Sequence, residues 1–450
     1  MDVPEVEKRI GITVFATKSA GFGGVIRRKP DDFVVEELLI GGERASVTPV
    51  AQFSGLGRYL VCVLVKRNWD TLLAVKTIAR QLGVSVERIA FAGMKDTRAL
   101  TAQHISLYGI RPEEVERIRI GGIRVVPVWY GNVKISELLF GNRFTILISS
   151  ISVKKDDVTR LANDVQEELL SLGGIPNFFG HQRFGTTRPI THLVGKTIVK
   201  GDLEEAALIF LAHSSVFEHP SMREVRDELL ETKDFEEALA GFPRHFKYER
   251  LMLKHLVGYP NDFLGAFRRL PLRLRALFVQ AYQSFLFNRF LSERIRRSAD
   301  WCAADVGDLI AALDEHGLPL AEGKVATAEN LARLADNVAS GKAFVSVPLV
   351  GFRQFLSKGG QGEIEAKVLA EEDIVPESFH CPAMPEVAAL GGLRAVLTPL
   401  INFTADRPVA DKENPTMHEL RLQFALSRGC YATIPLREFM KPQNPVVAGF

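Results

Sequence analysis

Residues 91–107, FAGMKDTRALTAQHISL, decide how this sequence is interpreted. An apolar run ends at Gly93, the charged pair Lys95 and Asp96 follows, and from Thr101 onward the side chains alternate as in a second strand. A strand, a turn and a strand place the carboxylate of Asp96 at the edge of a sheet, between two cations. Nearby positive charge keeps an aspartate ionised, so Asp96 is suited to act as a nucleophile or a base. The same pattern also fits an ordinary hairpin turn in which the aspartate only caps the chain.

The composition is that of a globular protein with two or three domains. The chain has 450 residues, of which 46% are hydrophobic and 24% are charged. The sequence has neither a basic-then-apolar leader nor an apolar run of membrane-spanning length, so we expect a cytoplasmic protein without a membrane segment. The cysteines are scattered and form no CxxC pair, which predicts neither disulfides nor a structural zinc site. Because the net charge is only +2, a nucleic-acid surface would require local clusters of cations.

The elements around residues 91–107 indicate an α+β fold. Strands are predicted at 59–65, 123–129 and 143–148, and a helix is predicted to start after the cap residue Asp70. A second amphipathic helix follows the third of these strands. The repeated order of strand, helix, strand and strand predicts ferredoxin-like halves that share a mixed, mainly antiparallel sheet.

The chain leaves this sheet and returns to it near the C-terminus. Residues 272–297 have the pattern of one long helix within a mostly helical region, and alternating apolar residues at 420–426 predict a returning strand. We therefore expect one domain formed by residues 1–190 and 400–450, with a mostly helical domain inserted at 191–399.

Several polar residues outside the central stretch have more than one interpretation. The end of the predicted helix 272–297 carries arginines that oppose the helix dipole favourably and are equally suited to hold phosphates. Asn288 is interpreted as a core amide, and Arg437 with Glu438 as a surface ion pair. The arginines of this helix end are Arg289, Arg294, Arg296 and Arg297.

Residues 173–185, GGIPNFFGHQRFG, are rich in aromatic and hydrogen-bonding side chains. Glycines and polar groups are poor core material, so we expect the phenylalanines of this loop to be exposed beside Asn177, Gln182 and Arg183. Exposed rings stack with unpaired bases, at about 1–3 kcal/mol per base, while amides read the Watson–Crick edge. The alternative is a loop that is anchored by its own phenylalanines.

A third segment, GFGGVIRRKPDDFVVEE at 21–37, carries consecutive cations from Arg27 to Lys29. Its glycines lack the spacing of a dinucleotide-binding loop. The segment is therefore either an exposed turn or a basic lip that faces phosphate.

Taken together, separated stretches of the chain resemble the TruD family of tRNA pseudouridine synthases. They occur in the family's order over nearly the whole sequence. The helical insertion resembles the longer form found in archaeal and eukaryotic members. The stretches are PDDFVVEE (30–37), FAGMKDTRALTAQ (91–103), PNFFGHQRFG (176–185), QSFLFN (283–288) and SRGCYATIPLREFMK (427–441).

This resemblance implies a fold and a reaction. The sheet domain would be a pseudouridine-synthase catalytic domain, and the insertion would be a TRUD domain. The protein would isomerise a uridine of tRNA, with position 13 as the expected target, and the isomerisation adds nothing to the RNA. We therefore expect tRNA as the partner, held in the cleft of a V-shaped molecule, and neither a metal nor a cofactor. A monomer is expected because no extended apolar heptad is present.

The resemblance also implies roles for particular residues. Asp96 matches the catalytic aspartate of the family, Phe179 matches the aromatic residue that stacks on the base, and Asn177 matches the amide of the same loop. A basic partner of the aspartate matches Arg27, where many relatives carry lysine, and Lys95 is the competing candidate. Neighbouring Gln182 and Arg183 are expected to bind substrate as well.

Two other classes of function stay open at this point. A non-catalytic RNA-binding protein with the same fold would bind tRNA without needing Asp96. A hydrolase would use Asp96 as a covalent nucleophile and would need a second carboxylate, for which Glu36 or Glu37 is the available candidate. A nucleotide-dependent enzyme would need a glycine-rich loop that enters a helix, and the sequence has none.

Overall fold

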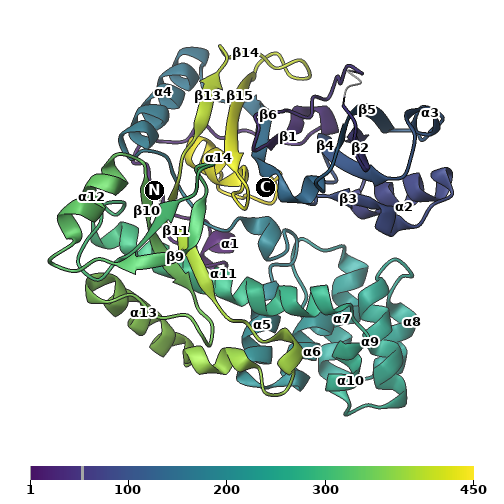
Figure 1. The fold of residues 1–450 in the computed structure, drawn as a ribbon. Coiled ribbons are helices and arrows are strands. Elements are labelled where there is room, and N and C mark those ends of the chain that lie inside the picture. The colour runs from purple at the N-terminus through teal and green to yellow at the C-terminus, as the bar shows by residue number, and fades with distance from the viewer. Residues whose placement is uncertain (1, 52–54) are drawn as a thin grey trace.

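The chain folds into two lobes that meet near its N-terminus and spread apart toward the right of Figure 1. This computed structural model describes residues 2–51 and 55–450. One lobe is built on a large sheet, and the other consists mainly of helices with a smaller sheet. The prediction of an α+β fold is confirmed.

The large sheet is mixed and mainly antiparallel, as predicted. Along its main path the strands lie in the order β13-β15-β6-β1-β4-β2-β5, with β3 beside β4 and β14 beside β15. Among the described strands of this sheet, β1 and β4 form the one parallel pair. The strands are β1 (Phe33–Leu39), β2 (Tyr59–Arg67), β3 (Ile89–Phe91), β4 (Leu100–Tyr108), β5 (Ile123–Gly131), β6 (Leu139–Ile151), β13 (Ile401–Ala405), β14 (Val409–Ala410) and β15 (His418–Ser427).

Strand β2 is buried on both faces, which explains its unbroken apolar sequence. Leu60 and Leu64 pack in one cluster with α2 (Thr71–Leu82), whereas Val61 and Val63 belong to a separate cluster. A strand that is covered on both sides has no need for alternating polar residues. The strand predicted at 59–65 is therefore confirmed.

Helices α2 and α4 (Lys155–Ser171) belong to the two halves of the large sheet. The side chain of Asp70 accepts a hydrogen bond from the amide of Leu73 at 2.9 Å and caps α2. This helix ends at Gly83, whose φ of 67° is left-handed. Helix α4 buries the apolar stripe that the sequence predicts.

The inserted lobe is organised around the long helix α11 (Leu272–Arg297), which packs against α5 (Thr191–Lys200). Gly195 permits this close packing, because a Cβ at that position would lie 2.0 Å from the carbonyl oxygen of Phe278. A smaller sheet in the order β11-β10-β8-β9 completes the lobe, so the insertion is not purely helical. Its other elements are α6 (Leu203–Ala212), α7 (Pro220–Thr232), α8 (Phe235–Gly241), α9 (Lys247–Gly258), α10 (Phe263–Arg268), β8 (Leu309–Leu313), β9 (Pro319–Val325), α12 (Leu331–Ala339), β10 (Ala343–Leu349), α13 (Gly359–Glu372) and β11 (Gly392–Ala395).

A short pair of strands lies where the chain passes between the lobes. Strand β7 (Ile175–Pro176) pairs with β12 (Leu397–Thr398), and β13 and β15 then join the large sheet. The boundaries at residues 190 and 400 stay a prediction. The remaining helices are α1 (Glu5–Lys8), α3 (Pro112–Val115) and α14 (Thr433–Met440).

The arginines at the end of α11 contact carboxylates of the protein itself. Arg294 is buried against Asp308 at 2.8 Å, and Arg289 lies 3.3 Å from Glu372. These contacts explain the cluster as a structural feature, and we assign it no role in RNA binding. The exposed pairs are Arg296 with Glu293 and Arg297 with Glu363.

The ion pair between Arg437 and Glu438 is buried, so the prediction of a surface pair is wrong. The two side chains are 1% and 0% exposed, and Arg437 also lies 2.7 Å from Glu7. Helix α1 brings Glu7 against α14, and this contact between opposite ends of the sequence is invisible to local pattern analysis. By contrast, Asn288 is a fully bonded core amide, as predicted.

Candidate active site

The topology of the sheet brings Arg27, Lys66 and Asp96 together at one end of the neighbouring strands β1, β2 and β4. Arg27 precedes β1 and Asp96 precedes β4. Because these two strands are parallel neighbours, their first residues lie side by side at the same end of the strands. Lys66 lies at the end of β2, which runs antiparallel to β4 with Arg67 opposite Leu100. Groups far apart in the sequence therefore meet around one carboxylate.

Asp96 lies in an irregular connection, residues 92–99, which takes the place of the tight turn expected from the sequence. Its side chain is 30% exposed. Nη2 of Arg27 lies 3.2 Å from Oδ1 of Asp96, and Nε2 of Gln182 donates to the same oxygen at 2.9 Å. Oδ2 receives no hydrogen bond from the described residues, so this oxygen is open to a substrate.

Lys66, which the sequence analysis missed, holds the backbone of this connection. Its Nζ donates to the carbonyl oxygens of Trp69, Lys95 and Asp96, at 2.8, 3.3 and 2.7 Å. The amide of Lys95 donates to Oγ1 of Thr71 at 3.1 Å. Burial lowers the pKa of Lys66 to about 8, against the opposing attraction of Asp96. The available signal in the sequence was a lysine directly after an apolar strand.

Arg27 is fixed before any substrate arrives. Its backbone has a φ of 59°, and its guanidinium lies 4.0 Å above the ring of Phe33. Nη1 donates to the carbonyl of Gly449 at 2.8 Å. Gly449 has a φ of 91°, and a Cβ there would lie 2.3 Å from the carbonyl of Ile26. Burial lowers the pKa of Arg27, and the Asp96 carboxylate opposes that effect.

Lys95 is not the ion-pair partner of Asp96. Its Nζ lies 2.9 Å from Oε1 of Glu37, and both side chains are buried. Burial alone would raise the pKa of Glu37, but the hydrogen bond to His104 and the charge of Lys95 outweigh it and lower that pKa. Glu36 in turn accepts the amide of Val47 at 3.0 Å. Both carboxylates that a hydrolase would need are thus occupied elsewhere.

The phenylalanines of the 173–185 loop are buried, so the expectation that they are exposed is wrong. Phe178 and Phe184 are 0% exposed, and Phe179 is 8% exposed. Asn288 of α11 accepts the amide of Phe179 at 2.9 Å and donates to its carbonyl at 3.1 Å. The loop is therefore anchored by its own phenylalanines, because α11 covers it.

Arg394, a second residue missed from the sequence, covers the ring of Phe179. Its guanidinium lies 4.0 Å from the ring centroid and donates to Oδ1 of Asn177 at 2.6 Å. Nδ2 of Asn177 donates to the carbonyl of Ala395 at 3.0 Å, so both ends of this amide are bonded within the protein. No local pattern marks Arg394, which lies on β11 of the inserted lobe and reaches the loop only through the fold.

Gln182 and Arg183 lie on the side of the loop that faces Asp96 and α11. Gln182 is exposed and makes the contact with Asp96, whereas Nε of Arg183 donates to Oγ of Ser284 at 3.1 Å. The guanidinium of Arg183 also lies 5.7 Å from the ring centroid of Phe179. The structure thus brings Arg27, Asp96 and Gln182 into contact and leaves Lys95 and Asn177 with other partners.

Across residues 2–51 and 55–450, no group of three or more His, Cys, Asp or Glu side chains is placed to hold a metal ion. In the same part of the chain no helix is long and apolar enough to cross a membrane. The absence of a metal stays a prediction.

The fold and the site define an α+β protein with a partly exposed, cation-bound aspartate at the end of the central strands of a mixed sheet. The family model for tRNA pseudouridine synthase D (TruD) matches residues 9–439. A relative from Methanosarcina barkeri, described as a probable tRNA pseudouridine synthase D, is 38% identical over 445 residues, which are 98% of either chain. A relative of the same description from Thermococcus onnurineus is 36% identical over 95% of this chain and 97% of its own.

A solved structure agrees with the sequence comparisons. The crystal structure of a Methanosarcina mazei protein described as TruD superposes with a TM-score of 0.84 at 36% identity, covering 99% of this chain and all of that one. The chain belongs to the tRNA pseudouridine synthase D (TruD) family.

Proposed function

We propose that this protein isomerises a uridine of tRNA, at position 13, to pseudouridine, with Asp96 as the central catalytic group. The observation that carries the proposal is the asymmetric binding of the Asp96 carboxylate. Arg27 and Gln182 both contact Oδ1, while Oδ2 stays open on a side chain that is 30% exposed. Membership of the TruD family supplies the reaction class.

The reaction breaks the bond between C1′ and N1, turns the uracil, joins C5 to C1′ and releases the proton of C5, so no atom is added to the RNA. Two routes begin at Oδ2 of Asp96: attack on C1′ or removal of a ribose proton. In both routes Arg27 stabilises the carboxylate, and Gln182 orients it. The preset position of Arg27 means that little reorganisation is needed when the substrate binds.

We assign the recognition of the extruded uracil to the Phe179 loop. Unstacking a base costs a few kcal/mol, and contact with an aromatic ring and a guanidinium recovers part of that cost. Arg183, which follows Gln182 and lies 5.7 Å from the ring centroid of Phe179, supplies the guanidinium, and the exposed 8% of Phe179 supplies the aromatic contact. Because both ends of the Asn177 amide are bonded within the protein, we assign Asn177 the positioning of Arg394 beneath Phe179.

We place the tRNA between the two lobes, which diverge from their junction at α1 and α11 (Figure 1). A cytoplasmic location, a monomeric state and a reaction without a metal complete the proposal.

The experiment that tests the proposal uses tRNA carrying tritium at C5 of uracil. We expect the wild type to release tritium and Asp96→Asn to release it at least about 1,000 times more slowly. The amide is nearly isosteric, so tRNA binding by the variant should stay within about threefold of the wild-type value.

Two results would contradict this assignment. Failure of the wild type to release tritium from a full tRNA pool would favour a non-catalytic RNA-binding protein. Release that persists in Asp96→Asn would place the chemistry on another residue.

A further inference from the structure

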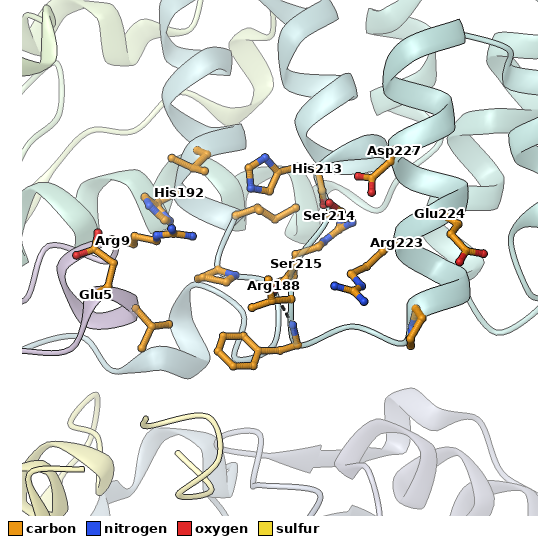
Figure 2. A pocket seen from close by; sticks show the side chains of 17 residues that line it. Glu5, Arg9, Arg188, His192, His213, Ser214, Ser215, Arg223, Glu224 and Asp227 are labelled. Atoms are coloured by element: carbon orange, nitrogen blue, oxygen red, sulfur yellow. Dashed lines mark hydrogen bonds between the residues drawn. The ribbon is translucent and has the colours of Figure 1, made fainter. Parts of the chain in front are cut away.

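A cavity of about 830 Å³ lies in the inserted lobe beside α1, apart from the Asp96 site (Figure 2). It is bounded by α1, by residues 188–193 and by the loop that leads into α7. A volume of this size is typical of pockets that hold a small molecule or a nucleotide.

Three arginines line the cavity, and among the described residues none of them forms an ion pair with a carboxylate. Arg188 instead donates to the carbonyl oxygens of Phe210 and His213, at 2.6 and 3.3 Å. Burial and the nearby charge of Arg226 lower the pKa of Arg188 to about 10, against the opposing charges of Glu218 and Glu249. The other two arginines are Arg9 and Arg223.

Arg223 carries an unsatisfied polar atom at this cavity. Its Nε is buried and has no hydrogen-bond partner among the described residues. In Figure 2 its side chain extends from α7 toward Ser215, whereas Glu224 points to the other side of the helix. The carboxylates of the lining are exposed, so solvent screens their charge more than that of the half-buried Arg188 and Arg223. They are Glu5, Glu224 and Asp227.

His192 forms part of the wall and is 2% exposed. Its Nδ1 has no hydrogen-bond partner among the described residues, and a buried polar atom left unbonded is unfavourable. The imidazole stacks on Phe285 at 5.0 Å and meets the edge of Phe184 at 5.2 Å. Phe184 belongs to the same loop as Gln182, so the cavity wall is packed directly on the loop that contacts Asp96.

The remaining lining includes apolar residues and hydroxyl groups, which suit a base and a ribose. Ile190, Leu193 and Phe217 are examples of the apolar part, and Ser214 contributes a hydroxyl. Arginines that form no ion pair among the described residues, beside an apolar wall, are suited to bind a phosphate together with an aromatic ring.

We propose that this cavity binds a phosphate-bearing nucleotide of the RNA, away from the uridine that reacts. The inference rests on the proposed function for the identity of that RNA. Arg188 follows Gln182 by six residues, so their Cα atoms are separated by at most about 22 Å. One RNA chain can therefore occupy the Asp96 site and this cavity together. The contact would fix the register of the tRNA relative to Asp96.

The test measures equilibrium tRNA binding at several salt concentrations for wild type, Arg9→Ala and Arg223→Ala. Both arginines make no side-chain hydrogen bond or ion pair within the described residues, so their removal should not unfold the protein. We expect Kd to rise about 3–10-fold for each variant. The slope of log K against log salt should become shallower by about 0.7–0.9 for each phosphate that the variant no longer neutralises.

Arg333→Ala is the matched control, because Arg333 is an exposed arginine on α12, outside the cavity. It removes the same charge and should change neither Kd nor the slope. If Arg223→Ala and Arg333→Ala behave alike in both quantities, the cavity does not hold RNA and the inference fails.

A second arm distinguishes RNA from a free nucleotide by titrating uridine monophosphate. The inference would be overturned if Arg223→Ala abolished the binding of free uridine monophosphate but left the tRNA affinity and the salt slope unchanged. That result would assign the cavity to a metabolite. Because binding does not require turnover, these results are separate from tritium release. If the wild type releases no tritium but Arg223→Ala still weakens tRNA binding, the proposed reaction would be refuted and the RNA site in the cavity would be supported.

Discussion

At the scale of single residues, the site depends on which cation reaches Asp96. Lys95 is adjacent in sequence but lies against Glu37, whereas Arg27 comes from 69 positions away and contacts Oδ1. Neighbouring side chains on an extended backbone point in opposite directions, so adjacency in sequence does not make an ion pair.

Replacement of Arg27 should show whether charge or geometry matters at this position. We expect Arg27→Ala to slow tritium release by about 100-fold or more, because the variant has no oriented charge beside the carboxylate. Arg27→Lys should retain more activity, since it keeps the charge although an ammonium cannot reproduce the interactions with Phe33 and Gly449. Single-turnover rates at saturating tRNA provide the comparison, and equal rates for the two variants would point to another partner for Asp96.

At the scale of elements, the end of β2 positions the connection between β3 and β4. Lys66 uses the three donors of its ammonium group for the three carbonyls of Trp69, Lys95 and Asp96. A neutral amine has only two N–H groups, so loss of a proton removes one of these bonds. The backbone that carries Asp96 is therefore sensitive to the charge of a residue that is itself fully buried.

This arrangement predicts an alkaline limit to activity. The pKa of Lys66 is about 8, so the group is charged below that pH and loses its proton as the pH rises through it. We expect the single-turnover rate of the wild type to fall above about pH 8. Lys66→Met should be slower at every pH and should lack this alkaline decline.

The control is Lys76→Met, which changes an exposed lysine on the neighbouring helix α2. It should keep both the rate and the alkaline decline of the wild type. An alkaline decline that persists unchanged in Lys66→Met would assign it to a different group.

At the scale of the whole molecule, a buried charge cluster joins the two ends of the chain. Arg437 of α14 lies 2.7 Å from Glu7 of α1 and 2.7 Å from Glu438, and Nε2 of His181 lies 3.5 Å from Glu7. Burial alone would raise the pKa of Glu7, but Arg437 and His181 outweigh it and lower that pKa. His181, the residue before Gln182, packs against this cluster, with its Nε2 3.5 Å from Oε1 of Glu7.

Arg437→Met should lower the free energy of unfolding by about 3–5 kcal/mol, because it leaves buried carboxylates without a cation. Denaturant unfolding measures this change. The surface arginine Arg297, paired with Glu363, supplies the control: Arg297→Met should cost no more than about 1 kcal/mol. Similar losses for the two variants would show that burial of the Arg437 cluster has no energetic consequence.

The same cluster predicts acid sensitivity. Because the folded pKa of Glu7 is lowered, its contribution to stability is present above the ordinary value of 4.5 and is lost as the pH falls below it. This acid-dependent part of the stability should shrink in Arg437→Met.

The sequence by itself determined the class of fold, the strand β2, the capped helix α2 and the returning strand β15, and it indicated Asp96 as the candidate carboxylate. These features depend on apolar periodicity, capping residues and local motifs, all of which act over a few neighbouring residues. Only the tertiary structure decided that Arg27 is the cation at Asp96, that Lys66 and Arg394 support the site, and that the loop phenylalanines are buried. Each of these contacts joins residues far apart in the chain, and their partners are selected by strand order and helix packing.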